Sequence, residues 1–243
     1  MEAIQTSLFE EYTFDEEVII KKSNGFYNRC VKRAIDFVLA LICVIVASPL
    51  LLIISLAVII ETGFPVFYRA PRGGYKGKSF RIFKFRSMVK NADKIGGGTT
   101  SLNDSRITKV GAFLRKTKLD EIPQLFNILG GTMSFIGPRP ELLKYTDAYD
   151  EQEKHILNVR PGITDYSSIK FINLDEIVGS ENADEMYEKY VLKTKNNLRL
   201  LYVSKVSFGT DIYLFATTVW KVVQKAFRFI FGKKDSNAEK VEQ

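Results

Sequence analysis

The sequence predicts an α+β fold, in which a small mixed cytosolic domain follows a helical hairpin in the membrane and precedes an amphipathic helix. Three observations predict it: an uncharged apolar run near the N-terminus, segments in which apolar and basic residues alternate, and stretches with helical apolar spacing. The chain has 243 residues, of which 46% are hydrophobic. This content supports a packed core and excludes a disordered, collagen-like or disulfide-stapled protein.

The chain begins with an acidic segment, which we assign to residues 1–28. Six acidic residues precede the first basic one: Glu2, Glu10, Glu11, Asp15, Glu16 and Glu17. Secretory signal peptides begin instead with a positive region. We therefore interpret residues 1–20 as a loosely ordered cytosolic lead-in.

The second element, residues 29–62, contains 24 consecutive residues without a formal charge, at positions 37–60. As a helix this run is about 36 Å long and could span a bilayer core of about 30 Å. However, Ser48 and Pro49 interrupt its middle, and basic residues flank both ends. These features favour a re-entrant helix–break–helix, with Ser48 bonded to a carbonyl that the kink frees. A kinked spanning helix is the alternative.

The third element, residues 63–210, is expected to be the cytosolic mixed domain. Two short strands around a Gly-rich turn are predicted within residues 66–88, and helices over 105–119, 121–129, 147–158 and 184–204. The glycines at 96–98 fit a surface connector. Residues 64–118 hold 14 Lys and Arg against two acids. Such a block indicates a polyanionic partner: a phosphorylated ligand, anionic lipid or nucleic acid.

The fourth element, residues 211–232, is predicted to be a basic amphipathic helix lying in the membrane interface, followed by a disordered tail over 233–243. Lys221, Lys225 and Arg228 fall on one face. The apolar side is supplied by Phe215, Val219, Trp220, Val223, Phe227, Ile230 and Phe231. A terminal helix packed on the domain is the alternative.

The available side chains restrict the chemistry. The single histidine, His155, argues against a His-clustered zinc site and against most Ser-His or Cys-His pairs. Cys30 and Cys43 cannot form a disulfide framework, which favours a reducing compartment. Carboxylates, arginines and lysines are left to carry any reaction.

The segment LRKTKLDEIPQLFNILGG holds the candidate site. Asp120 fits the N-cap of a helix with Pro123 in its first turn, and a cap alone would explain it. Basic residues surround it, however, and the later arginines Arg139 and Arg160 stand beside prolines on stiff turns that suit phosphate recognition. An ionised Asp120 among such arginines can attack phosphorus, and Glu121 can hold Mg²⁺. The pattern indicates a phosphoryl-transfer site at a membrane surface.

The motifs KRAIDF, KFRSM, DSRITKVGAFLRKTKLDEIPQLFNIL, MSFIGPRPE and RPGIT, in this order around the Ser-Pro hairpin, resemble the bacterial monotopic phosphoglycosyl transferases, which are sugar transferases. The resemblance covers roughly residues 29–220. It implies transfer of a sugar 1-phosphate from a UDP-sugar to undecaprenyl phosphate with release of UMP, by a ping-pong mechanism. It also implies a re-entrant hairpin, and a pathway that starts capsule, exopolysaccharide, O-antigen or glycoprotein glycan assembly.

Carried over residue by residue, the resemblance implies that Asp120 forms the phosphosugar intermediate and that Glu121 is the Mg²⁺ ligand. The substrate-binding residues that it implies are Arg115, Arg139, Arg160, Pro138, Lys84 and Arg86. Residues 163–168 read ITDYSS where the family commonly has ITGWAQ, so the sugar pocket is expected to differ from those of the best-known members.

The expected partners are a UDP-sugar, undecaprenyl phosphate, the lipid bilayer and downstream glycosyltransferases, with a homodimer left open and no nucleic acid. The expected location is the bacterial inner membrane, with the catalytic domain facing the cytoplasm. Two alternatives stand beside this hypothesis: a membrane-anchored basic module that binds anionic lipid or nucleic acid, and a lipid phosphatase that passes an aspartyl intermediate to water. The motifs do not select the sugar.

Overall fold

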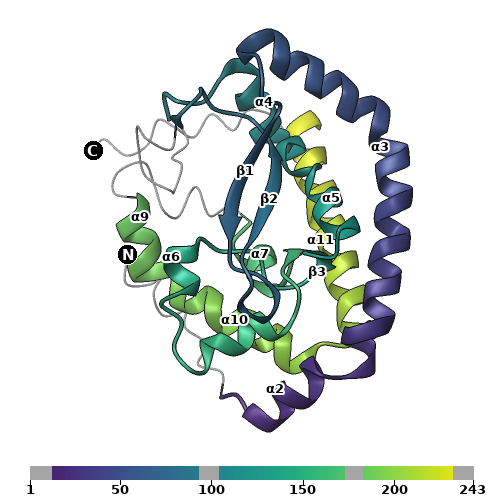
Figure 1. The fold of residues 1–243 in the computed structure, drawn as a ribbon, viewed down its shortest axis with the longest axis vertical. Helices are drawn as coiled ribbons and strands as arrows, with labels where there is room; N and C mark the ends of the chain where they lie inside the picture. The colour runs from purple at the N-terminus through teal and green to yellow at the C-terminus, as the bar shows by residue number, and fades with distance from the viewer. Residues whose placement is uncertain (1–12, 93–103, 173–182, 232–243) are drawn as a thin grey trace.

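The computed structural model describes residues 13–92, 104–172 and 183–231, with side chains left undescribed at 183–184 and 225–231. One long helix, α3 (Lys32–Thr62), follows the short π-helix η1 (Tyr27–Val31) and curves along one side of the molecule. The strands and the shorter helices lie on its concave side (Figure 1). This mixed content of helix and sheet agrees with the predicted α+β class. The glycines at 96–98 and the tail over 233–243 fall outside the described residues.

Helix α3 continues through Ser48 and Pro49, so the predicted break between two helices is not present. Pro49 lacks an N–H and therefore leaves the carbonyl of Ile45, four residues earlier, without its helical partner. The Ser48 hydroxyl donates to that carbonyl at 2.8 Å, as the sequence predicted. Because this bond replaces the missing one, the chain changes direction within one bent helix rather than by an interruption (Figure 1). The re-entrant course stays a prediction.

The outward face of α3 is apolar and exposed. Of the helical stretches in the described part of the chain, only Tyr27–Thr62 is long and apolar enough to cross a membrane, by length and composition. Val46 is 74% exposed and Ile60 84% exposed, whereas Ala40, Ile54 and Val58 on the inward face are buried. So large an apolar surface requires a lipid or protein environment.

A β-hairpin forms the centre of the fold. Strands β1 (Phe67–Arg72) and β2 (Phe80–Phe85) pair antiparallel around a turn that contains η2 (Tyr75–Gly77), which confirms the predicted strands and Gly-rich turn. A second pair, β3 (Ser134–Ile136) and β4 (Gly162–Thr164), is parallel and was not predicted. The two strands approach each other closely because the residue after β3, Gly137, and the first residue of β4, Gly162, are both glycine. A Cβ on Gly162 would lie 2.2 Å from the nitrogen of Gly137.

The predicted helices are present in part. Residues 105–119 and 121–129 contain α4 (Lys109–Thr117), η4 (Leu119–Glu121) and α5 (Gln124–Leu129). Residues 147–158 hold only the 3₁₀-helix η5 (Glu153–Asn158), so that helix was wrongly predicted over its first six residues. Residues 184–204 are helical, as predicted. This stretch consists of α9 (Ala183–Met186), η6 (Tyr187–Val191) and α10 (Leu192–Lys205). Two short helices, α6 (Leu143–Thr146) and α7 (Tyr166–Lys170), were not predicted.

The acidic lead-in is more ordered than the sequence suggested. Helix α2 (Glu16–Ser23) begins at the capping residue Asp15, whose carboxylate accepts from the N–H of Glu17 at 2.9 Å. Ile19 is 1% exposed and packs against the core cluster that includes residues of α10. The prediction of a loose segment over residues 1–20 is therefore wrong from residue 16 onward, because Ile19 docks this helix on the domain. Residues 1–12 lie outside the described part.

Helix α11 (Phe208–Phe231) corresponds to the predicted amphipathic helix. Its first turns are anchored in the domain, since Asp211 and Leu214 are buried. Beyond them the exposed side carries large apolar groups: Phe215, Val219, Trp220, Val222 and Val223. The packed-helix alternative holds as far as Lys221, because Thr218 bonds to Thr164 at 2.9 Å and Lys221 Nζ donates to the carbonyl of Ile169 at 3.0 Å. A place in the membrane interface stays a prediction.

We expect Asp211→Asn to lower the free energy of unfolding by about 3 kcal/mol, because it removes the acid that is hydrogen-bonded to a buried lysine. The Asp211 carboxylate accepts from Lys32 Nζ at 2.5 Å, from the Tyr27 hydroxyl at 2.6 Å and from the Tyr202 hydroxyl at 2.8 Å. The Lys32 and Asp211 side chains are only 6% and 9% exposed. Thermal unfolding in detergent would measure the loss. Asp147→Asn, at an exposed position, is the control, and an equal melting temperature for both variants would contradict the prediction.

Candidate active site

The candidate site lies where α4 ends and α5 begins. Lys118 adopts a left-handed conformation (φ 59°) and terminates α4. The chain then forms η4, which carries Asp120 and Glu121 and lies against strand β2. Asn127 of α5 completes this arrangement, because it accepts from the N–H of Phe83 at 2.8 Å and donates to the carbonyl of Arg81 at 2.9 Å. The turn is therefore fixed to the central hairpin.

Asp120 is not a helix cap. The N-cap position of α5 is Pro123, and no side chain caps the helix. Asp120 is instead 7% exposed, and its Oδ1 is buried without a hydrogen bond to any described residue. The interpretation of Asp120 as an N-cap is wrong, because the residue lies one turn earlier than that position requires.

The pKa of Asp120 is raised above its ordinary value. Burial is the largest cause, since it disfavours the charged form, and the negative charge of Glu121 adds to it. Lys84, Arg115 and Lys118 act in the opposite direction. Asp120 thus lies near several cations, and no described residue forms an ion pair or hydrogen bond with its Oδ1.

Glu121 has the opposite environment. Its Oε1 accepts from Lys84 Nζ at 2.9 Å and from Arg139 Nη2. Burial alone would raise the pKa of Glu121, but Arg139 and then Lys84 hold it well below its ordinary value. Two adjacent carboxylates whose pKa values are displaced in opposite directions are typical of groups with different catalytic tasks.

The surrounding cations fall into two kinds. Lys84 and Arg139 are engaged with Glu121, and Arg139 is further fixed by donating to the carbonyl of Ile163 at 3.0 Å. In the described part of the chain, Arg115 and Lys118 make no side-chain hydrogen bond or ion pair, although both lower the pKa of Asp120. These two are therefore free to meet a ligand's phosphates.

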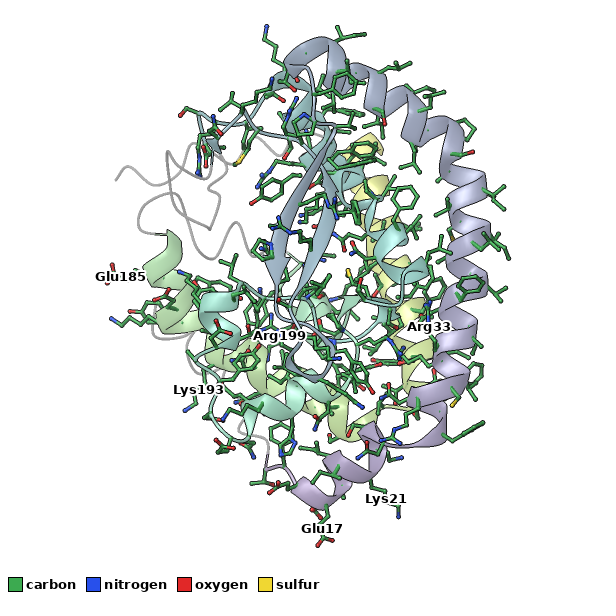
Figure 2. The ribbon with its side chains drawn as sticks, in the orientation of Figure 1. Glu17, Lys21, Arg33, Glu185, Lys193 and Arg199 are labelled. Carbon is green, nitrogen blue, oxygen red and sulfur yellow. The ribbon has the colours of Figure 1, made fainter. Side chains whose placement is uncertain are left out.

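The loop that carries Arg139 is held from two sides. The carbonyl of Pro138 accepts from the N–H of Gly162 at 3.0 Å, which fastens the loop to β4. Behind it, Glu141 accepts from Arg199 Nη2 at 2.6 Å and from the Tyr187 hydroxyl. Arg199 is 1% exposed and lies in the interior, in the lower part of Figure 2. This buried ion pair was missed, because an arginine and a glutamate 58 residues apart carry no local signal.

Two of the predicted substrate-binding residues make their contacts elsewhere. Arg160 donates to the carbonyl of Gly131 at 3.1 Å and stacks over the ring of Tyr75 at 5.0 Å. It lies near Arg33, which reaches from α3 to the last carbonyls of α5 (Figure 2). Arg86 follows β2 and points to the end of α3. The structure therefore groups Lys84, Arg115 and Arg139 with the carboxylate pair, while Arg160 and Arg86 serve other contacts.

The close approach of α4 to the hairpin was also missed. A Cβ on Gly111 would lie 2.0 Å from the carbonyl oxygen of Ser87, so only glycine allows this contact. A glycine within a predicted helix is the signal that could have indicated it. The approach matters because α4 carries Arg115 toward Asp120.

The residues present fit a magnesium ion that is shared with a substrate. The described part of the chain contains no group of three or more His, Cys, Asp or Glu that could hold a metal on its own. It does contain two carboxylate oxygens, Asp120 Oδ1 and Glu121 Oε2, to which no described residue donates. Mg²⁺ usually takes one or two carboxylates together with substrate phosphates, which matches this donor set.

Comparison with known proteins gives consistent matches. Residues 27–225 match the family model described as bacterial sugar transferase. The chain is 39% identical over 198 residues to the UDP-glucose:undecaprenyl-phosphate glucose-1-phosphate transferase of Escherichia coli K12. The aligned residues make up 80% of this chain and 40% of that relative. It is also 39% identical over 144 residues to the UDP-N-acetylgalactosamine-undecaprenyl-phosphate N-acetylgalactosaminephosphotransferase of Aeromonas hydrophila. This alignment covers 57% of this chain and 34% of that relative.

A third relative is of similar length. The chain is 33% identical over 193 residues to the uncharacterized sugar transferase EpsL of Bacillus subtilis. The aligned residues make up 79% of this chain and 87% of EpsL. By contrast, the chain spans about 40% of the length of the E. coli transferase.

Proposed function

The chain belongs to the bacterial sugar transferase family, and on this premise we propose that it transfers a sugar 1-phosphate from a UDP-sugar to undecaprenyl phosphate and releases UMP. The names of two relatives, which specify UDP-glucose and UDP-N-acetylgalactosamine, support the donor class and the acceptor. The observation that carries the proposal is the contrast within the carboxylate pair. Asp120 has a free buried oxygen among cations, while Glu121 is held by Lys84 and Arg139.

In the proposed first step, an Asp120 carboxylate oxygen attacks the phosphorus that bears the sugar. A bond forms between this oxygen and phosphorus, the bond from phosphorus to the bridging oxygen breaks, and UMP leaves with the electron pair. In the second step an oxygen of the lipid phosphate attacks the same phosphorus and displaces the carboxylate. Asp120 returns to its ionised form, and the sugar stands on a lipid diphosphate.

The cations around Asp120 have separate tasks in this mechanism. Arg115 and Lys118, which have no other side-chain partner in the described part of the chain, would bind the donor's phosphate oxygens. Arg139 and Lys84 hold Glu121 ionised and oriented. Glu121, with the diphosphate, would hold Mg²⁺, and the chemistry supplied there would be neutralisation of charge on the leaving phosphate. We assign to Pro138 the task of keeping the Arg139 loop rigid.

The membrane arrangement is also a proposal. We infer that α3 enters and leaves the bilayer on the cytoplasmic side and that α11 lies in the interface. The bend at Pro49 and the basic residues on both flanks support the first inference, and the exposed apolar groups of α11 support the second. The active-site turn would then lie at the bilayer surface, where the lipid phosphate is found.

The test is UMP release by the purified protein in nanodiscs with Mg²⁺, undecaprenyl phosphate and a panel of UDP-sugars. We expect UMP from at least one donor, together with an equal amount of lipid-linked sugar diphosphate. UMP without the lipid product would indicate transfer to water and contradict the transferase. Well-folded protein that releases no UMP from any donor would contradict the proposal as a whole.

A further inference from the structure

Gln124, the first residue of α5, is a buried amide whose donor is unused. The residue is 1% exposed, and its Nε2 is buried without a hydrogen-bond partner among the described residues. A buried donor without a partner costs free energy, so native proteins rarely keep one. Gln124 has no task in the two steps proposed for Asp120, and its unused donor therefore needs another explanation.

The backbone places Gln124 beside the carboxylate pair. The 3₁₀ turn η4 leads into α5 through Ile122 and Pro123, which both have helical backbone angles. Along this path several backbone N–H groups donate to the carbonyl three residues earlier, at 3.0 to 3.3 Å. Residues three or four positions apart on such a path are neighbours, with Cβ atoms about 5–6 Å apart. Gln124 is three positions after Glu121 and four after Asp120, so it lies next to both.

Two unpaired groups of opposite kind therefore lie close together in the interior. Asp120 Oδ1 is a free acceptor and Gln124 Nε2 is a free donor, yet no hydrogen bond joins them. A phosphoryl group bonded to Asp120 would satisfy both at once. Its phosphorus would take the free carboxylate oxygen, and its non-bridging oxygens would be acceptors within reach of the flexible amide side chain.

We propose that Gln124 is a further catalytic residue, whose Nε2 donates to a non-bridging oxygen of the phosphoryl group as that group moves to and from Asp120. This inference rests on the proposed function and adds a residue to its active site. No covalent bond of Gln124 changes, and no proton leaves it. The hydrogen bond strengthens as negative charge develops on the phosphoryl oxygens in the transition state.

A neutral donor suits this position better than a cation. A lysine or arginine here would form an ion pair with Asp120, which would lower the pKa of the carboxyl group and weaken its attack on phosphorus. An amide has no net charge, so it leaves Asp120 ionised and unpaired until the substrate binds. Lys84 and Arg139 show the contrast, because both are paired with Glu121, the carboxylate that does not attack.

The first experiment replaces Gln124 with methionine, which lacks the donor but keeps an unbranched side chain of similar length. We expect kcat for UMP release to fall about 100-fold while the KM for the UDP-sugar stays within about threefold, because the contact is made mainly in the transition state. The melting temperature should equal or exceed that of the wild type, since an unsatisfied donor is removed.

Gln152→Met, at an exposed glutamine, is the matched control and should change neither quantity. A merely structural Gln124 would give the opposite pattern. Gln124→Met would then lower the melting temperature and leave kcat of the folded protein within about twofold of the wild type. That result would overturn the proposal.

The second experiment tests the contact itself, with a donor in which sulfur replaces one non-bridging oxygen on the phosphorus that bears the sugar. Sulfur is a weak hydrogen-bond acceptor, so one of the two diastereomers should react more slowly than the oxygen substrate in the wild type. We expect Gln124→Met to reduce this rate difference about fivefold or more, as a double-substitution cycle requires of groups in contact. Equal oxygen-to-sulfur rate ratios in both proteins, for both diastereomers, would reject the contact.

Failure of this inference and failure of the proposed function give different results. If the wild type releases UMP and Gln124→Met releases it equally fast, the transferase stands and the role of Gln124 is rejected. If the wild type releases no UMP from any donor in the panel, the proposed function fails, and the role of Gln124 fails with it.

Discussion

Asp120→Asn is expected to reduce UMP release by a factor on the order of 10⁴ or more, because an amide oxygen is a poor nucleophile and cannot form the acyl phosphate. The variant should fold normally, since asparagine has nearly the same volume and Asp120 Oδ1 makes no hydrogen bond to a described residue. Its melting temperature at pH 7 should equal or exceed that of the wild type. Activity that survives this substitution would contradict the covalent mechanism.

The raised pKa of Asp120 gives a pH dependence with a definite sign. A carboxyl whose pKa is higher in the folded state binds its proton more tightly when folded, so its contribution to stability falls as pH rises from the ordinary pKa through the raised one. Asp120→Asn should therefore stabilise the protein more at neutral than at acidic pH. In the wild type, the acidic limb of kcat/KM should lie above the ordinary pKa of aspartate, since only the ionised form attacks.

Glu121→Gln is expected to lower kcat about 100-fold or more and to raise the Mg²⁺ concentration needed for half-maximal activity. Unlike Asp120→Asn, it should also destabilise the fold, because Lys84 and Arg139 lose their common partner. We expect a loss of about 1–3 kcal/mol, less than for a fully buried pair, since these cations are 25% and 33% exposed. A Mg²⁺ titration of UMP release and thermal unfolding would measure the two effects.

The matched control for Glu121→Gln is Glu188→Gln. Glu188 also pairs with a lysine, Lys144, at 2.9 Å, but both side chains are about half exposed. This substitution should change neither kcat nor the Mg²⁺ dependence, and it should cost well under 1 kcal/mol. If Glu121→Gln were indistinguishable from the control in Mg²⁺ dependence, its assignment as the metal ligand would be contradicted.

Sequence patterns over short stretches predicted the central hairpin, the Ser48 hydrogen bond and the family. Alternation of apolar and basic residues predicted the β1–β2 hairpin, and Ser48 before Pro49 predicted the hydroxyl bond to Ile45. The order of motifs around Asp120 and Glu121 predicted the family. In each case the determining residues lie within a few positions of one another or in a fixed order along the chain.

Tertiary packing decided the rest. The sequence could not place Asp120 in a buried turn instead of at a helix cap, because burial depends on how η4 lies against the hairpin. The sequence assigned Lys84, Glu121 and Arg139 to one site, but it could not show that both cations pair with Glu121 itself, or that Arg160 bonds elsewhere.

By itself, then, the sequence determined the family, the apolar helix and the acidic pair. Only the tertiary structure decided which carboxylate is free, which is held, and that Arg86 donates to the end of α3 instead of joining the carboxylate pair. The physical reason is that pKa shifts and ion pairs depend on distances and desolvation. Lys84, which helps to lower the pKa of Glu121, is 37 positions away from it in the sequence. Glu141 and Arg199, which form a buried ion pair, are 58 positions apart.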